Sequence, residues 1–214
     1  MNFSDYAAQI KAIGRIITPE AVATSRAVIA PLIDSTLLEG ISVTRDIAYG
    51  DHERHRLDVF NGADQQDLRS VLLFVHGGGF ISGDKHSPDS PFYSNIAAWA
   101  VRQGFAGVNM TYRLAPEHPW PAGIEDLRAA IEWIQQNGEQ HGLDANNIFT
   151  MGQSAGGTHI AGYLAHPEIY AAAPHGLSGS ILLSAVYDFV AMPTRENEKA
   201  YLGEDESLYY QRSS

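Results

Sequence analysis

The segment Ile148-Phe149-Thr150-Met151-Gly152-Gln153-Ser154-Ala155-Gly156 joins a largely apolar run to a run of small residues. The first run predicts a buried strand, and the small residues from Ala155 onward predict a helix. The Gly-x-Ser-x-Gly pattern between them is typical of a nucleophile elbow, a sharp strand-to-helix turn that exposes the serine hydroxyl. Glycine at positions 152 and 156 allows strand and helix to approach closely. An isolated match also fits a tight turn with a surface serine, so a second motif is needed.

That second motif is His76-Gly77-Gly78-Gly79, which follows an apolar run at residues 71–75. Because glycines carry no side chain, the backbone N–H groups of this segment are free to point into a cavity. Two such donors near the residue after a nucleophilic serine form an oxyanion hole. The glycines also fit a flexible turn or a phosphate-binding loop. The phosphate loop is disfavoured because Asp84 stands where that motif has its lysine, and a carboxylate repels polyphosphate.

Strand and helix patterns alternate along the chain. Apolar residues at even spacing predict a strand over 41–49, which pairs as a hairpin with a strand at 57–59. Continuous apolar runs predict buried strands at 71–75, 106–112, 148–151 and 180–185, with helices at 93–103, 124–138 and from 155. This alternation predicts a mainly parallel sheet covered by helices on both faces. The first forty residues look helical and separate, with a helix-start signal at Thr18-Pro19-Glu20.

Composition excludes several classes of protein. The 214 residues carry a net charge of −11, which disfavours binding to nucleic acid and to anionic membrane surfaces. The absence of cysteine excludes disulfides, thiolate metal sites and a cysteine nucleophile. We expect a cytoplasmic protein without a membrane span, because no apolar run approaches ~20 residues and no signal-peptide pattern is present. His52-Glu53-Arg54-His55 fails as a zinc-protease motif, since its histidines are three residues apart instead of four.

Together the motifs resemble a known family. Besides the two glycine motifs, the chain contains Tyr112-Arg113-Leu114-Ala115-Pro116-Glu117-His118-Pro119-Trp120-Pro121-Ala122 and Glu125-Asp126. In this order they look like the hormone-sensitive-lipase-like carboxylesterase branch of the α/β-hydrolases, close to acetyl-xylan and feruloyl esterases and to kynurenine formamidases. The resemblance implies the α/β-hydrolase fold over residues 41–214, with residues 1–40 as a helical cap segment.

The resemblance also implies roles for individual residues. It makes Ser154 the nucleophile, and it places the oxyanion hole at the N–H groups of Gly78, Gly79 and Ala155. It gives His76 a supporting role in the loop and Glu125-Asp126 a structural role. It implies no metal and no organic cofactor, and its partner is a small-molecule ester. Three aromatic residues either line an acyl or alcohol pocket or belong to the core: Phe80, Trp120 and Tyr187.

The catalytic triad of this fold is not complete in the sequence. Its order is Ser, then Asp or Glu, then His. After Ser154 the histidines are His159, His166 and His175, and all three precede Asp188, the next aspartate. His159 lies five residues after the serine on the same expected helix, which points it away from the hydroxyl. The two strand–helix units that follow the strand at 180–185 in this fold, about 60 residues, are also absent, so we expect residues 41–214 to form an incomplete core.

The sequence favours a serine hydrolase that cleaves carboxylic esters of small or short-acyl substrates through an acyl-enzyme intermediate. Two alternatives stay open. One is a non-catalytic, truncated hydrolase or pseudoenzyme that binds a small ligand, and the other is an aryl formamidase. The sequence makes no prediction of the oligomeric state.

Overall fold

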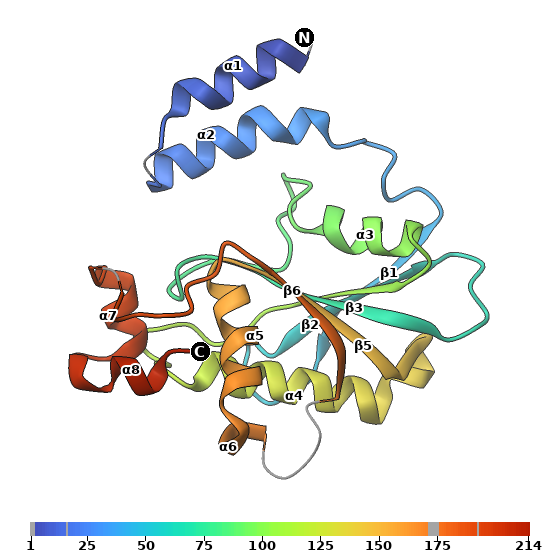
Figure 1. Cartoon of the computed structure of the whole chain (residues 1–214). Coiled ribbons are helices and arrows are strands. Elements are labelled where there is room, and N and C mark those ends of the chain that lie inside the picture. Colours follow the sequence, from blue (N-terminus) through green and yellow to red (C-terminus); the bar gives the residue numbers. More distant parts are fainter. Residues whose placement is uncertain (1–2, 16, 171–175, 192) are drawn as a thin grey trace.

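The computed structural model describes residues 3–15, 17–170, 176–191 and 193–214 (Figure 1). Six strands form one sheet in the order β1-β2-β4-β3-β5-β6. They are β1 (Ile41–Ala48), β2 (Arg56–Gly62), β3 (Arg69–Val75), β4 (Ala106–Met110), β5 (Leu143–Gln153) and β6 (Leu177–Leu183). The pairs β4–β3, β3–β5 and β5–β6 are parallel, and β1–β2 and β2–β4 are antiparallel. The hairpin and the mainly parallel sheet expected from the sequence are therefore confirmed.

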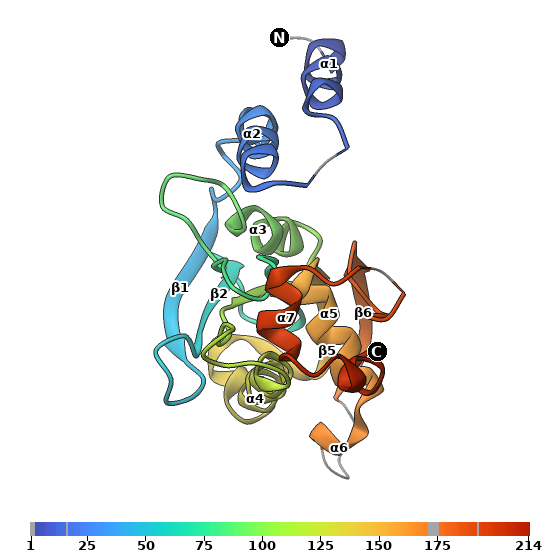
Figure 2. The same cartoon turned by 90° about the vertical axis from the view of Figure 1, so that its left-hand side faces the viewer.

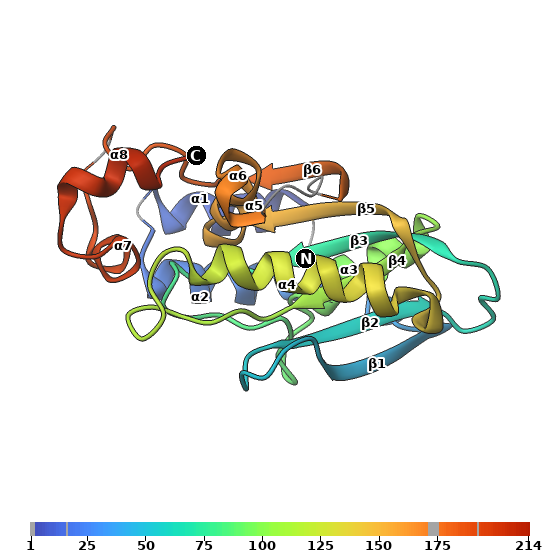
Figure 3. The same cartoon turned by 90° about the horizontal axis from the view of Figure 1, so that it is seen from below.

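Helices cover the two faces of the sheet (Figures 1 and 3). On one face lies α3 (Ser94–Arg102), where Gly107 of β4 fits closely against Ala97. On the other face α4 (Ala122–Asn137) and α5 (Ala155–Ala165) bury apolar residues against β3 and β4 in the main core. The short 3-10 helix η2 (Gly138–His141) follows α4, and the short α-helix α6 (Pro167–Tyr170) follows α5. This is the layered arrangement that the strand–helix alternation predicted.

Strand β6 departs from the expectation of a buried strand. It lies at the end of the sheet, and Ile181 and Leu183 are 45% and 40% exposed. Only its pairing with β5 is found within the described part of the chain. The prediction of complete burial was wrong because it rested on hydrophobicity alone. Hydrophobicity does not show whether anything packs on a strand's second face.

The N-terminal helices lie on the α3 side of the sheet, beyond α3 (Figures 1 and 2). They are α1 (Phe3–Ile13) and α2 (Pro19–Ile29), followed by the turn η1 (Ala30–Leu32). The helix-start signal is confirmed, because the Thr18 side chain accepts a hydrogen bond from the N–H of Ala21. The apolar residues of α2 are less covered than their helical spacing suggested, and Val22 is 41% exposed.

The C-terminal segment lies beyond the carboxyl ends of β3, β5 and β6 (Figure 3). It contains α7 (Glu196–Leu202), η3 (Glu206–Leu208) and α8 (Tyr209–Arg212). Although this segment is rich in acidic residues, it contributes apolar side chains to a second buried cluster. The cluster's fully buried members are Phe80, Ala115, Ala155, Phe189, Tyr201, Leu202 and Tyr209. Consequently this segment packs on the two glycine motifs.

No helix in the described ranges combines the length and the hydrophobicity that crossing a bilayer requires.

Candidate active site

Ser154 stands between β5 and α5 in a strained turn. Its backbone has φ 54° and ψ −123°, and a positive φ is uncommon for a residue with a side chain. A Cβ on Gly152 would lie 2.6 Å from the backbone of Gly156, and a Cβ on Gly156 would press on the carbonyl oxygen of Val75. The two glycines therefore permit the close crossing of β5, α5 and β3. This is the geometry of a nucleophile elbow.

The triple glycine leaves the end of β3 next to this turn. Val75 of β3 is paired with Gly152 of β5, so the two turns begin at the same level of the sheet edge. Gly77 packs directly on Gln153, the residue before Ser154. Gly78 has φ 140°, and a Cβ there would collide with the Ser82 carbonyl. The sequence therefore brings the loop and the elbow into contact, as the parallel pairing of their strands requires.

Unpaired hydrogen-bond donors gather at this edge. Within the described residues, the N–H groups of Gly78, Gly79 and Ala155 donate no hydrogen bond. Ala155 is the first residue of α5, where the helix itself supplies no acceptor and the helix dipole favours negative charge. In the same described ranges, the half-buried Ser154 hydroxyl has no hydrogen-bond partner. A free hydroxyl beside free N–H donors can add to a carbonyl and stabilise the resulting oxyanion.

The sequence of this chain matches the model of a known protein family. The model described as BD-FAE matches residues 57–192, more than half of the chain. The chain belongs to the BD-FAE family.

Several curated relatives of this BD-FAE chain are named esterases. It is 45% identical to esterase LipI of Mycobacterium tuberculosis over 91 residues, which are 42% of this chain and 27% of LipI. It is 36% identical to esterase LipC of the same organism over 141 residues, which are 64% of this chain and 34% of LipC. The matched part of the chain thus spans about a third or less of the length of these relatives.

Solved structures support the fold of this BD-FAE member. A bacterial heroin esterase superposes with a TM-score of 0.68 at 26% identity, covering 97% of this chain and 73% of the esterase. Esterase B from Lactobacillus rhamnosis superposes with a TM-score of 0.71 at 19% identity, covering 99% of this chain and 70% of that one. At the lower identity only the fold is comparable. The expected α/β-hydrolase fold and the resemblance to its carboxylesterase branch are confirmed.

His76 lies in the core beneath the triple glycine. Its side chain is completely buried, its Nδ1 lies 2.7 Å from the Gly77 carbonyl oxygen, and its ring stacks on Tyr112 at 4.4 Å. Burial lowers the pKa of His76 to about 4, so the ring is neutral at pH 7. The Nδ1 atom therefore carries the ring proton, and it donates a hydrogen bond to the Gly77 carbonyl oxygen. These contacts fit a support for the loop.

His159 is buried between α5 and the C-terminal segment. Its Nδ1 lies 3.2 Å from the Tyr201 hydroxyl, and its ring meets Phe80 and Tyr112 edge-on. Burial lowers the pKa of His159 to about 3. A base this weak cannot accept a serine proton efficiently near pH 7. Within the described residues His159 makes no hydrogen bond to Ser154.

His166 supplies no base to Ser154 either, because both of its ring nitrogens are hydrogen-bonded elsewhere. His166 bonds Glu168 through Nδ1 at 3.0 Å and the Ser213 carbonyl through Nε2 at 2.9 Å. His175 lies outside the described residues. Among the residues that the structure describes, no histidine is hydrogen-bonded to Ser154.

Asp126 belongs to an ion-pair network at the start of α4. It accepts hydrogen bonds from the backbone N–H of Arg113 at 2.7 Å and from the Arg113 Nε at 2.8 Å. His55, from the motif that resembled a zinc site, lies 3.0 Å from the same carboxylate. Glu125 pairs with Arg113 at 3.1 Å. Asp126 therefore links the Pro-rich connection to the residue before β2, and Glu125 adds an ion pair to Arg113, which fits a structural role.

The three aromatic residues divide between core and surface. Phe80 is buried and stacks on Tyr201, with ring centroids 4.2 Å apart. Trp120 packs against both core clusters, and Tyr187 is 42% exposed.

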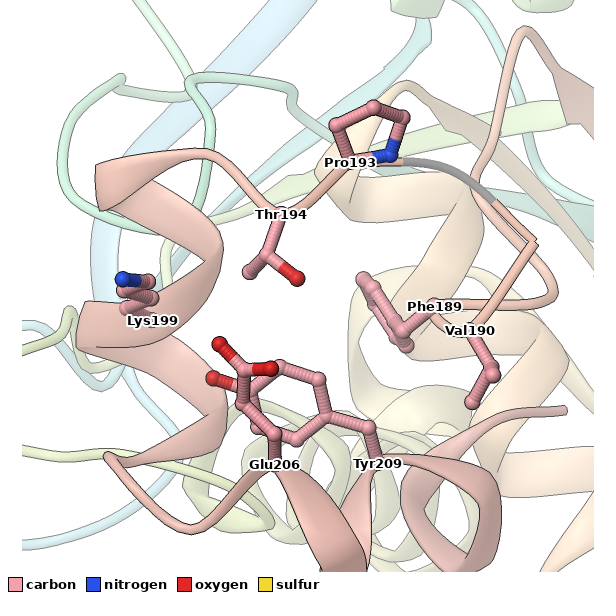
Figure 4. Close-up of a pocket in the computed structure, with 7 residues that line it drawn as sticks. All are labelled: Phe189, Val190, Pro193, Thr194, Lys199, Glu206 and Tyr209. Atoms are coloured by element: carbon pink, nitrogen blue, oxygen red, sulfur yellow. The ribbon is translucent and has the colours of Figure 1, made fainter.

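A cavity of about 310 Å³ opens beside α7 (Figure 4). Neither Ser154 nor any residue of the expected oxyanion hole lines it; the lining consists of Phe189, Val190, Pro193, Thr194, Lys199, Glu206 and Tyr209.

Sequence reasoning missed three residues that contact the two glycine motifs. The Asn197 side chain donates to the Gly79 carbonyl at 3.1 Å, and Tyr201 stacks on Phe80. The Tyr93 hydroxyl lies 3.5 Å from the Gln153 side-chain oxygen. No short motif links these residues to their partners, because each partner is at least sixty positions away. Only the folded chain brings them together.

Proposed function

We propose that Ser154 is the nucleophile of a serine hydrolase that cleaves carboxylic esters of small or short-acyl substrates. The observation that carries this proposal is the strained Ser154 turn beside three N–H groups that find no acceptor in the part of the chain that the structure describes. The esterase names of the curated relatives support the same reaction class. Gly78, Gly79 and Ala155 supply the donors of the oxyanion hole in this proposal.

The reaction proceeds in two halves. The Ser154 Oγ attacks the ester carbonyl carbon, and the N–H donors stabilise the negative charge that develops on the carbonyl oxygen. The C–O bond to the alcohol breaks, and the alcohol leaves with the proton that the serine gave up. Water then hydrolyses the acyl-enzyme to the carboxylic acid and restores the Ser154 hydroxyl. The serine proton needs an acceptor, and both His76 and His159 are too weakly basic at pH 7. We infer that a group outside the described residues acts as the base.

The test is covalent labelling of Ser154. We expect a fluorophosphonate to add one adduct to the intact protein, mapped to Ser154, and none to Ser154→Ala. Turnover of p-nitrophenyl acetate and butyrate should fall at least ~10³-fold in the same variant. Ser207→Ala, an exposed serine in η3, is the matched control. Esterase turnover retained by Ser154→Ala would refute the assignment.

Among the described residues no histidine is hydrogen-bonded to Ser154, and this favours one alternative, a non-catalytic module that binds a small ligand. That reading predicts neither adduct nor turnover, together with ligand binding that survives Ser154→Ala. Faster turnover of formanilides than of acetyl and butyryl esters would instead identify a formamidase. The cytoplasmic location and the boundary between a cap at residues 1–40 and a core at 41–214 stay predictions.

A further inference from the structure

Three different partners hold the carbonyl groups of the triple glycine. The His76 ring donates to the Gly77 oxygen at 2.7 Å, and Ser82 donates to the Gly78 oxygen through its N–H at 3.1 Å and its hydroxyl at 2.8 Å. The Gly79 oxygen accepts from the Asn197 side chain at 3.1 Å. The first two partners are at most four residues away, whereas Asn197 is 118 residues away.

These contacts determine where the N–H groups point. In a trans peptide unit the C=O of one residue and the N–H of the next point in opposite directions. His76 therefore orients the N–H of Gly78, and Ser82 orients the N–H of Gly79. Gly79 can still rotate about its own backbone bonds, because it has no side chain and its φ is 60°. Asn197 holds the peptide unit that follows Gly79, and this restricts the rotation.

Asn197 also occupies the space next to Gly79. A Cβ built on Gly79 would lie 3.0 Å from the Asn197 Nδ2 atom, so the amide packs directly on the glycine. The helix that carries Asn197 is itself firmly anchored. In its capping box the buried Glu198 accepts from the N–H of Arg195 at 2.9 Å, and Tyr201 stacks on Phe80. These two contacts anchor the helix that carries the Asn197 amide.

We propose that Asn197 is a positioning residue that holds Gly79 in the conformation needed for the oxyanion hole. This inference rests on the proposed function of Ser154. An amide suits the role because its NH₂ group can donate to a carbonyl oxygen. An ionised aspartate has almost the same shape, but it only accepts hydrogen bonds, and it would repel both the Gly79 carbonyl and a nearby oxyanion.

The experiment compares Asn197→Ala and Asn197→Asp with the parent protein, using the rate at which a fluorophosphonate labels Ser154. We expect the second-order rate constant to fall about tenfold in Asn197→Ala and further in Asn197→Asp. This is less than the ~10²–10³-fold loss on removing an oxyanion donor. On a p-nitrophenyl ester, kcat should fall while KM changes less than twofold. The exposed neighbour Glu196→Gln is the control and should label at the parental rate.

Thermal unfolding distinguishes a positioning role of Asn197 from a contribution to the stability of the fold alone. The expected result is a melting temperature within ~2 °C of the parent in both Asn197 variants, together with the slower labelling of Ser154. Parental labelling rates in both variants would overturn the role of Asn197 and leave the proposed function intact. Absence of a Ser154 adduct on the parent protein would overturn both.

Discussion

At the residue scale, Gly156 controls how closely α5 approaches β3 behind Ser154. A Cβ at this position would press on the Val75 carbonyl and lie 2.6 Å from that of His76. Backbone atoms give way less easily than the tip of a side chain, so the helix must move. The position of Ser154 thus depends on a neighbour that takes no part in the chemistry.

We expect Gly156→Ala to lower the free energy of unfolding by about 1–3 kcal/mol, the usual range for overpacking. Urea unfolding followed by circular dichroism measures this. Gly62→Ala is the matched control, because its Cβ meets only the Cβ of Gln65 at 3.9 Å. The control should change stability by less than about 0.5 kcal/mol. Equal urea midpoints for the two variants would contradict the packing argument.

His159 makes stability depend on pH. Its folded pKa, about 3, lies below the unfolded value of 6.5, because burial disfavours the charged ring. Its contribution to stability is therefore complete above pH 6.5 and is lost as the pH falls toward 3. In this window the free energy of unfolding should decrease by up to about 1.4 kcal/mol per pH unit from this residue.

Urea unfolding at pH 7.5, 6 and 5 tests the prediction in the parent and in His159→Gln. The variant should show a shallower loss of stability between pH 6 and 5, although it is less stable at pH 7.5. The burial of His76 acts in the same direction and remains in both proteins. If the two slopes coincide, His159 does not titrate differently in the folded and unfolded states.

At the element scale, the strands and helices with strong local patterns were predictable. The continuous apolar run at 71–75 predicted a buried strand. The helical spacing of Ile124, Leu127 and Ile131 predicted a helix with one buried face. Boundaries were less predictable: β5 begins at Leu143 instead of Ile148, because Leu143 pairs with Arg69 before a shift in register. Ser154 and the triple glycine were found because they are contiguous motifs.

Contacts between distant elements were not predictable from the sequence. Lys85 is an example, since it is only 5% exposed and ties the loop after the triple glycine to the β1–β2 hairpin. Its ammonium group lies 2.6 Å from Asp46 and 3.0 Å from Asp58, which is fully buried. Although burial disfavours its charge, the hydrogen bonds to these carboxylates raise the pKa of Lys85. No spacing rule pairs residues so far apart in sequence.

Replacing Lys85 with methionine leaves Asp58 buried with fewer opposite charges. Removing one partner of a buried ion pair is strongly destabilising, and we expect a loss of about 3 kcal/mol in the free energy of unfolding. Lys11→Met, on the exposed face of α1, is the control for loss of a lysine charge. Urea unfolding compares the two. Arg45 also forms an ion pair with Asp58, so a loss below 1 kcal/mol in Lys85→Met would mean that Arg45 alone compensates the Asp58 charge.

At the scale of the whole molecule, one exposed arginine connects the N-terminal helices to the elbow. Arg26 of α2 donates to the Tyr93 hydroxyl at 2.8 Å and lies over the rings of Phe92 and Tyr93. The same Tyr93 hydroxyl reaches Gln153, next to Ser154. The sequence predicted the helices but not this connection, because an arginine on a polar helix face has no distinctive pattern. If residues 1–40 act as a cap, Arg26 links them to the site through Tyr93 and Gln153.

We therefore expect Arg26→Ala to loosen the helices without unfolding the core. A cation–π contact at an exposed site contributes about 0.5–1 kcal/mol, too little to matter for global stability. Amide hydrogen exchange in α1 and α2 should become faster, while the melting temperature stays within ~2 °C. Relative rates on acetyl, butyryl and hexanoyl esters should shift, with fluorophosphonate labelling of Ser154 changed less than twofold. Lys11→Ala, elsewhere on these helices, should change none of these quantities. An unaltered acyl preference alongside faster exchange would show that the helices are anchored by Arg26 but do not select the substrate.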